Sequence, residues 1–131
     1  MSEQKNMDVA ECEKFILDTI SDLGGHVSFA ELMHRSDRIK GTFAICLPSR
    51  ENLILWTGLS EEFCAAFSNL KQSLRMHARP TSVLVYMHDG MQLNLPVAKR
   101  ITKTTPKRDT WIPVCLYAGA YPTEKMPKGG W

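Results

Sequence analysis

The sequence predicts an α+β fold, in which an antiparallel sheet made of hairpins is backed by about three helices. Two observations indicate this class. Apolar residues recur at steps of three and four in segments 8–23 and 59–74, which is the spacing of one helix face. Between residues 42 and 97, short apolar runs come in two pairs, and turn residues separate the members of each pair.

The size of the chain predicts one domain. Its 131 residues, 44% of them hydrophobic, supply a single core of ordinary size. We therefore expect a globular domain over residues 1–117 and a flexible tail, rich in Gly and Pro, over residues 118–131.

Capping residues mark where the helices begin. In segment 8–23, Asp8 and Glu11 have the spacing of a capping box, and a Gly pair after the segment supplies a left-handed stop. Ser28 can cap a second, short helix, and Ser60 a third one, which Pro80 would end.

Two hairpins are predicted. In the first, runs 42–47 and 52–57 are apolar on both faces, which is typical of central strands or of strands at a subunit contact. In the second, runs 82–87 and 91–97 flank an Asp-Gly pair, which suits a tight turn with positive φ angles.

A last apolar run, 111–117, is expected to return to the sheet. Its Pro113 favours an edge strand or a broken strand, because proline cannot donate a hydrogen bond to a neighbouring strand. Trp111 follows the basic residues Lys107 and Arg108, so its ring either packs in the sheet or stacks on a base of a single strand.

The first half of the chain resembles a winged-helix domain over roughly residues 9–57. The residues that carry the resemblance are the helix ending in Leu23-Gly24-Gly25, the short strand His26-Val27-Ser28, the helix Ser28-Phe29-Ala30-Glu31-Leu32 and the hairpin 42–57 as the wing. Winged-helix proteins commonly bind DNA through a recognition helix in the major groove. Only residues 36–40, about one turn, remain here for that helix, which is shorter than the family's.

One segment concentrates positive charge. Residues 99–108 hold five basic side chains and no acidic one, in a predicted loop between two strands. Such a loop can contact nucleic-acid phosphates, or it can be a solvated loop that keeps the chain soluble. The candidate phosphate contacts are Lys99, Arg100, Lys103, Lys107 and Arg108, joined by a looser set near the second helix, Arg35, Arg38 and Lys40.

The N-terminal third is acidic, with a net charge of −5 over residues 1–31. Glu11, Asp18 and Asp22 are spaced seven and four apart, so they share one helix face. That face could dock on a basic protein partner, or it is simply a solvated helix face.

Few residues carry the spacing of a chemical site. The four cysteines and four histidines stand apart, without metal-ligand or redox spacing, and no nucleophile or phosphate-loop motif occurs. We expect no cofactor and no catalysis, and we interpret the cysteines as buried free thiols. No leader pattern opens the sequence, and no apolar run reaches the about 18–20 residues of a membrane span, so a cytoplasmic chain without a membrane partner is predicted.

Together, the charge pattern and the resemblance favour a small nucleic-acid-binding protein, in the first place DNA-binding, that acts in transcription regulation through its basic loop. The alternative is a non-catalytic protein-interaction module or inhibitor, such as one encoded by a mobile element, that docks through the acidic helix. Strands that are apolar on both faces would also fit a homodimer.

Overall fold

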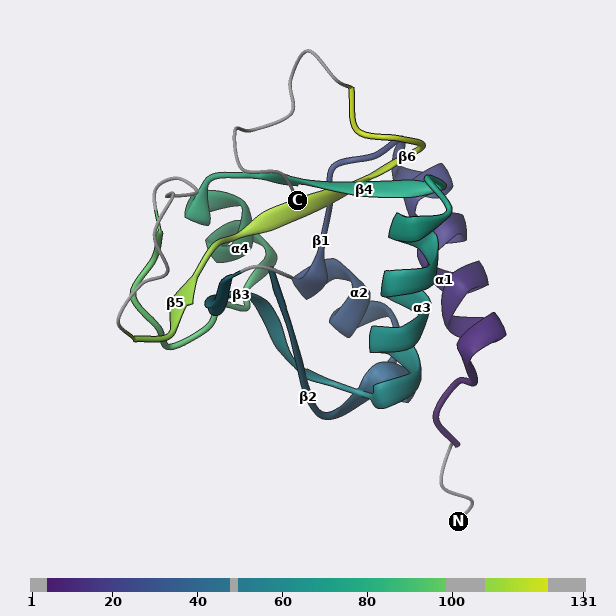
Figure 1. The fold of residues 1–131 in the computed structure, drawn as a ribbon, viewed down its shortest axis with the longest axis horizontal. Coiled ribbons are helices and arrows are strands. Elements are labelled where there is room, and N and C mark those ends of the chain that lie inside the picture. Colours follow the sequence, from purple (N-terminus) through teal and green to yellow (C-terminus); the bar gives the residue numbers. More distant parts are fainter. Residues whose placement is uncertain (1–4, 48–49, 99–107, 123–131) are drawn as a thin grey trace.

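The computed structural model describes residues 5–47, 50–98 and 108–122, and in these residues it has the predicted α+β class (Figure 1). The elements are α1 Val9–Leu23, β1 Val27–Ser28, α2 Phe29–Arg35, the 3-10 turn η1 Asp37–Ile39, β2 Lys40–Leu47, β3 Arg50–Leu59, α3 Glu61–Gln72, β4 Met76–Pro80, α4 Val83–Asp89, β5 Thr110–Trp111 and β6 Val114–Ala118.

The strands form two small sheets rather than one. The first has the order β1-β6-β4 with antiparallel neighbours, and the second has the order β2-β3-β5, in which β3 and β5 run parallel. In Figure 1, α1 and α3 pack side by side, β4 and β6 cross above them, and the β2–β3 hairpin lies on the opposite side of α2 and α3. The expectation of a purely antiparallel sheet is therefore corrected by the β3–β5 pair.

The predicted helix starts are confirmed. Glu11 donates its backbone N–H to Asp8 at 2.8 Å, and the Glu11 carboxylate accepts the Asp8 N–H at 3.2 Å, which completes the capping box. Gly24 ends α1 in the left-handed region, at φ 73°. Ser28 and Ser60 each accept the N–H three residues further on, so both cap the helices that follow them.

The third helix ends earlier than expected. It stops at Gln72 instead of running to Pro80, and residues 76–80 form β4. Leu74 adopts a left-handed φ of 60°, which turns the chain back along β6. The pairing of β4 with β6 joins segments far apart in sequence, and helical periodicity cannot reveal such a contact.

The predicted second hairpin is wrong. Residues 83–89 form α4, which Ser82 caps and Gly90 ends at a left-handed φ of 83°. The Asp-Gly pair is thus a helix end, because Tyr86 is buried and ties the helix to the body of the protein. Its hydroxyl donates to the carbonyl of Val114 at 2.6 Å and accepts the N–H of Phe29 at 3.0 Å.

The last apolar run divides at Pro113, as a broken strand, between β5 in one sheet and β6 in the other. The expectation of an edge is wrong for β6, which is the central strand of its sheet. The folded part of the chain extends past residue 117, where the tail was expected to start, because Ala118 belongs to β6 and Tyr121 contacts His77. Residues 123–131 lie outside the described residues.

Aromatic rings fill the core between the sheets and helices. Trp56 contacts Phe29, Tyr86 and Trp111 at ring-centroid distances of 6.1, 5.2 and 5.9 Å. Trp111 is fully buried, and its indole N–H donates to the Leu55 carbonyl at 3.2 Å. Of the two interpretations of Trp111, sheet packing therefore holds.

The two strands of the first hairpin differ in burial. β3 is buried from residue 53 to residue 56, as expected of a central strand, but β2 is an edge strand whose residues 40–44 are exposed. Phe43 is 49% exposed instead of buried in the core. The second sheet is only three strands wide, and this leaves the outer side of β2 without a neighbour in the described part of the chain.

Candidate nucleic-acid interface

The residues that flank segment 99–108, the segment with the highest positive charge, are hydrogen-bonded to each other. The N–H of Ala98 donates to the Trp111 carbonyl at 2.7 Å, and the N–H of Trp111 donates to the Pro96 carbonyl at 2.8 Å. Trp111 belongs to β5 at the edge of the second sheet, so Ala98, which precedes segment 99–108, and Trp111, which follows it, lie together at that edge. Arg108 is exposed, and the other candidate contacts lie outside the described residues: Lys99, Arg100, Lys103 and Lys107.

The residues of the second predicted basic set form ion pairs with carboxylates. Arg35 contacts Glu31 at 3.1 Å and Asp22 at 3.5 Å. Lys40 contacts Asp37 at 2.7 Å, and its hydrogen bond and charge lower the pKa of that carboxyl group. Arg35 lies at the end of α2 and Lys40 at the start of β2, and such paired charges offer less attraction to phosphate than free ones.

The carboxylates on the acidic face of α1 form ion pairs with two of these arginines and with one lysine of α1 itself. Glu11 contacts Arg38 at 3.1 Å, and Asp18 contacts Lys14 at 2.5 Å. With Asp22 on Arg35, each of the three predicted docking carboxylates has a basic partner. The acidic helix and the basic set, expected as separate surfaces, therefore form one surface of mixed charge.

A second concentration of functional groups lies on the first sheet, and sequence reasoning missed it. We call it the arginine–aromatic cluster: His26, His77, Arg79, Tyr117 and Tyr121. His77 of β4 and Tyr117 of β6 are register partners, so their side chains share one face, and Arg79 follows on that face two residues later.

Arg79 of the cluster makes cation–π contacts with two tyrosine rings. The Arg79 guanidinium carbon lies 4.3 Å from the centre of the Tyr117 ring and 5.9 Å from that of Tyr121. His77 stacks on Tyr117 at 5.5 Å with 18° between the ring planes. His26 lies at the other side, where its Nδ1 and the Tyr117 hydroxyl are 2.7 Å apart.

Hydrogen bonds fix the protonation of His77. The Gly119 carbonyl, 2.9 Å from Nδ1, can only accept, so Nδ1 carries the proton. Nε2 then accepts the Nε–H of Arg79 at 2.9 Å. Burial, together with the charge of Arg79, lowers the pKa of His77 below its ordinary value of 6.5, which keeps this neutral tautomer in place.

A hollow of about 440 Å³ opens beside the cluster, lined by Arg79 and Tyr117 and by the end of α1. Gly25 lets the ring of Tyr117 approach, because a Cβ at this position would lie 3.0 Å from the Cδ1 atom of Tyr117. Gly25 also has a φ of 97°, which side-chain-bearing residues rarely adopt. The close approach at Gly25 thus helps to position Tyr117, and Tyr117 in turn positions Arg79.

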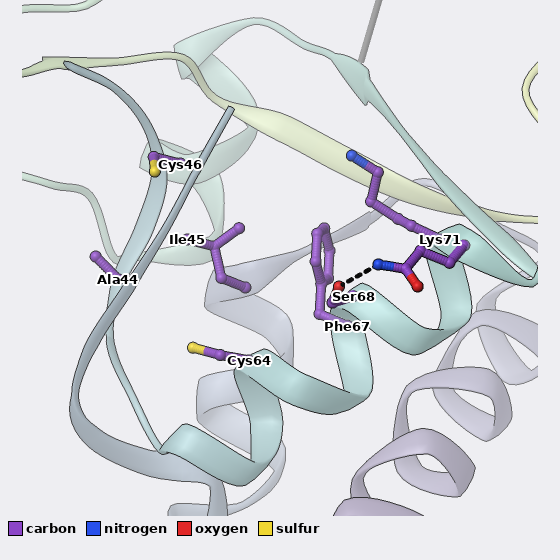
Figure 2. Close-up of a pocket in the computed structure, with 8 residues that line it drawn as sticks. Ala44, Ile45, Cys46, Cys64, Phe67, Ser68 and Lys71 are labelled. Carbon is purple, nitrogen blue, oxygen red and sulfur yellow. Dashed lines mark hydrogen bonds between the residues drawn. The ribbon is translucent and has the colours of Figure 1, made fainter. Parts of the chain in front are cut away.

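A separate apolar groove of about 460 Å³ runs between β2 and α3, and Figure 2 shows its two walls. Phe67 and Ile45 face each other across it, while Lys71 lies 5.9 Å from the Phe67 ring centre. Burial lowers the pKa of Lys71. The polar groups of the groove come from one end of α3.

The cysteines are free, as predicted, but only two of them are buried. Burial raises the pKa of Cys12 and of Cys115 to about 11, so both thiols stay protonated. Cys46 is exposed on the edge strand β2, and Cys64 of α3 is half-buried. In the described ranges, no three His, Cys, Asp or Glu side chains are grouped to hold a metal ion.

Comparison with protein-family models, with curated proteins and with solved structures finds no match to this chain. Within the described residues, no helix has both the length and the apolar character needed to cross a bilayer. The function is therefore inferred from the chain's own charges, rings and hydrogen bonds.

Proposed function

We propose that this chain binds nucleic acid, in the first place DNA, and contacts phosphates through segment 99–108. One observation carries the proposal. The five cations of this segment account for more than the whole excess of positive charge, since without them the net charge of +2 becomes −3. Phosphates are attracted to such a local concentration of cations, and each contact releases bound counterions.

The other described charges support this choice of segment. Arg35, Arg38 and Lys40 are each held by a carboxylate, so they are less available to a polyanion. The hydrogen bonds of Ala98 and Trp111 anchor the residues on either side of the segment at β5, as is useful for an arm that reaches along a duplex. The resemblance of residues 9–57 to a winged-helix domain favours DNA and a role in transcription.

A salt titration tests the proposal. Binding of a labelled random-sequence duplex is followed by fluorescence anisotropy from about 50 to about 200 mM salt. The variant combines Lys103→Glu, Lys107→Glu and Arg108→Glu. Because each lost phosphate contact removes about 0.9 from the slope of log affinity against log salt, the slope should flatten by up to about 2.7.

A control variant separates a local contact from overall charge. Lys5→Glu, Lys14→Glu and Arg75→Glu together give the same change in net charge at exposed positions outside the segment. We expect this variant to keep the steep salt dependence. The proposal is overturned if the unmodified chain does not bind at about 50 mM salt, or if both variants lose affinity equally.

A further inference from the structure

The cation of the arginine–aromatic cluster has no acidic partner in residues 5–47, 50–98 and 108–122. Arg79 is half-buried, and its guanidinium carbon lies over the ring of Tyr117, 4.3 Å from the ring centre. A guanidinium has five N–H donors, and the one on Nε is used by His77. Among the described residues no acceptor takes the other four, whereas Arg35 and Arg38 are both paired with carboxylates.

The cluster holds this guanidinium in a fixed orientation. Tyr117 packs against the guanidinium, and the neutral Nε2 of His77 accepts its Nε–H. Tyr117 is itself positioned by Gly25 and by its contact with His26. A planar cation that is oriented before a ligand arrives loses less entropy on binding than a free arginine side chain.

The hollow beside Arg79 has the size and chemistry of a small-ligand site. Its volume of about 440 Å³ falls within the range of about 300–1,000 Å³ that such sites occupy. Leu17 and Ile20 contribute apolar side chains to its lining, and Arg79 and Tyr117 contribute a planar guanidinium with N–H donors and an aromatic ring. A planar, heterocyclic ring next to a negative charge matches this lining, and that is the chemistry of a nucleotide.

We propose that the arginine–aromatic cluster binds one unpaired nucleobase, which stacks on the guanidinium plane of Arg79 while the free N–H groups of Arg79 contact the adjacent phosphate. This inference rests on the proposed function, because segment 99–108 supplies the attraction that brings a strand to the protein. In a duplex both faces of a base are covered by its neighbours, so only a single strand or a flipped nucleotide can fill the site. The cluster therefore gives the protein a preference for unpaired nucleotides.

The test compares a single strand with the duplex of the same sequence. Arg79→Lys keeps the charge but removes the plane, and Tyr121→Leu removes a ring that lies 5.9 Å from the guanidinium. Each should weaken single-strand binding by about 5- to 150-fold, the range that corresponds to loss of one stacked base, and should leave duplex binding within about twofold. Arg75→Lys is the matched control, since Arg75 is exposed and has no ring contact among the described residues.

A spectroscopic measurement reports stacking directly. A 2-aminopurine in the single strand loses fluorescence when it stacks, so binding of the unmodified chain should quench it and binding of Arg79→Lys should not. Melting temperatures of all variants show that the fold is kept. The inference fails if Arg79→Lys and Tyr121→Leu bind the single strand as the unmodified chain does, with equal quenching.

Two other outcomes are distinguishable. Equal losses on single strand and duplex would make Arg79 a plain phosphate contact and would overturn the stacking inference, while the proposed function would stand. If the unmodified chain binds neither strand form at about 50 mM salt, the proposed function itself is overturned.

Discussion

The buried hydroxyl of Tyr86 is expected to hold three separate segments together. It donates to the Val114 carbonyl at 2.6 Å and accepts the Phe29 N–H at 3.0 Å, so it joins α4 to β6 and to the start of α2. Tyr86→Phe keeps the ring in its packing against Trp56 and Trp111 but leaves two buried backbone groups without a partner. At about 1–2 kcal/mol for each orphaned group, the free energy of unfolding should fall by about 2–4 kcal/mol.

Urea denaturation followed by tryptophan fluorescence measures this loss, since Trp56 and Trp111 both contact the altered ring. Tyr121→Phe is the control, because the Tyr121 hydroxyl makes no hydrogen bond within the described residues, and its effect should stay within about 0.5 kcal/mol. A loss below about 0.5 kcal/mol for Tyr86→Phe would refute the reasoning, because it would mean that the two backbone groups find other partners.

Three further changes test the fold and the cluster. Gly25→Ala should destabilise the protein more than Gly24→Ala, by about 1–2 kcal/mol in thermal melts, because both have positive φ but only the first would press a Cβ on the ring of Tyr117. Ser60→Ala should cost about 1 kcal/mol by the same measurement, through loss of a helix cap. Since burial above all lowers the pKa of His77 below 6.5, the unfolded chain binds more protons than the folded one just below that pH. The stabilisation that comes from keeping His77 neutral is therefore fully present above pH 6.5, and the free energy of unfolding should decline as the pH falls through that value. In His77→Gln, the free energy of unfolding measured from about pH 5 to about pH 7.5 should lack this decline.

Local signals in the sequence predicted what local contacts decide. The capping residue Asp8 and the Gly stop after α1 act within one turn of helix, so they could be identified without a structure. The segment from Ser82 to Gly90 carries a cap and a left-handed stop that fit either a hairpin or a helix. Whether this segment forms a hairpin or a helix depends on Tyr86, whose hydroxyl group bonds to residues that are 57 and 28 positions away in the sequence.

The candidate sites also depend on contacts between residues far apart in the sequence, so sequence patterns could not predict them. Glu11 and Arg38 are 27 residues apart, and their contact changes two expected surfaces into one. His77 and Arg79 show the alternation of a strand face, but Tyr117 reaches them only through the register of β4 with β6. The excess of positive charge in segment 99–108 needed no structure to be found, because a sum over sequence reveals it.

The spacing of the two proposed contacts sets an upper limit on the length of strand that is needed to reach both. Tyr117 follows Arg108 by nine residues, and nine residues span at most about 32 Å even when fully extended. At about 3.4 Å per stacked nucleotide, a strand of at most about ten nucleotides covers that distance. A strand that reaches both sites gains affinity because the second contact becomes intramolecular.

Affinity for single strands should therefore rise steeply up to about ten nucleotides and then level off, with only a small statistical gain at greater length. Anisotropy titrations with strands of about five, ten and twenty nucleotides measure this dependence at one salt concentration. In Arg79→Lys the rise should end at a shorter length, since only the basic segment is left to contact the strand. Equal affinities of the shortest and longest strands for the unmodified chain would contradict a two-contact interface, because a single contact gains nothing from added reach.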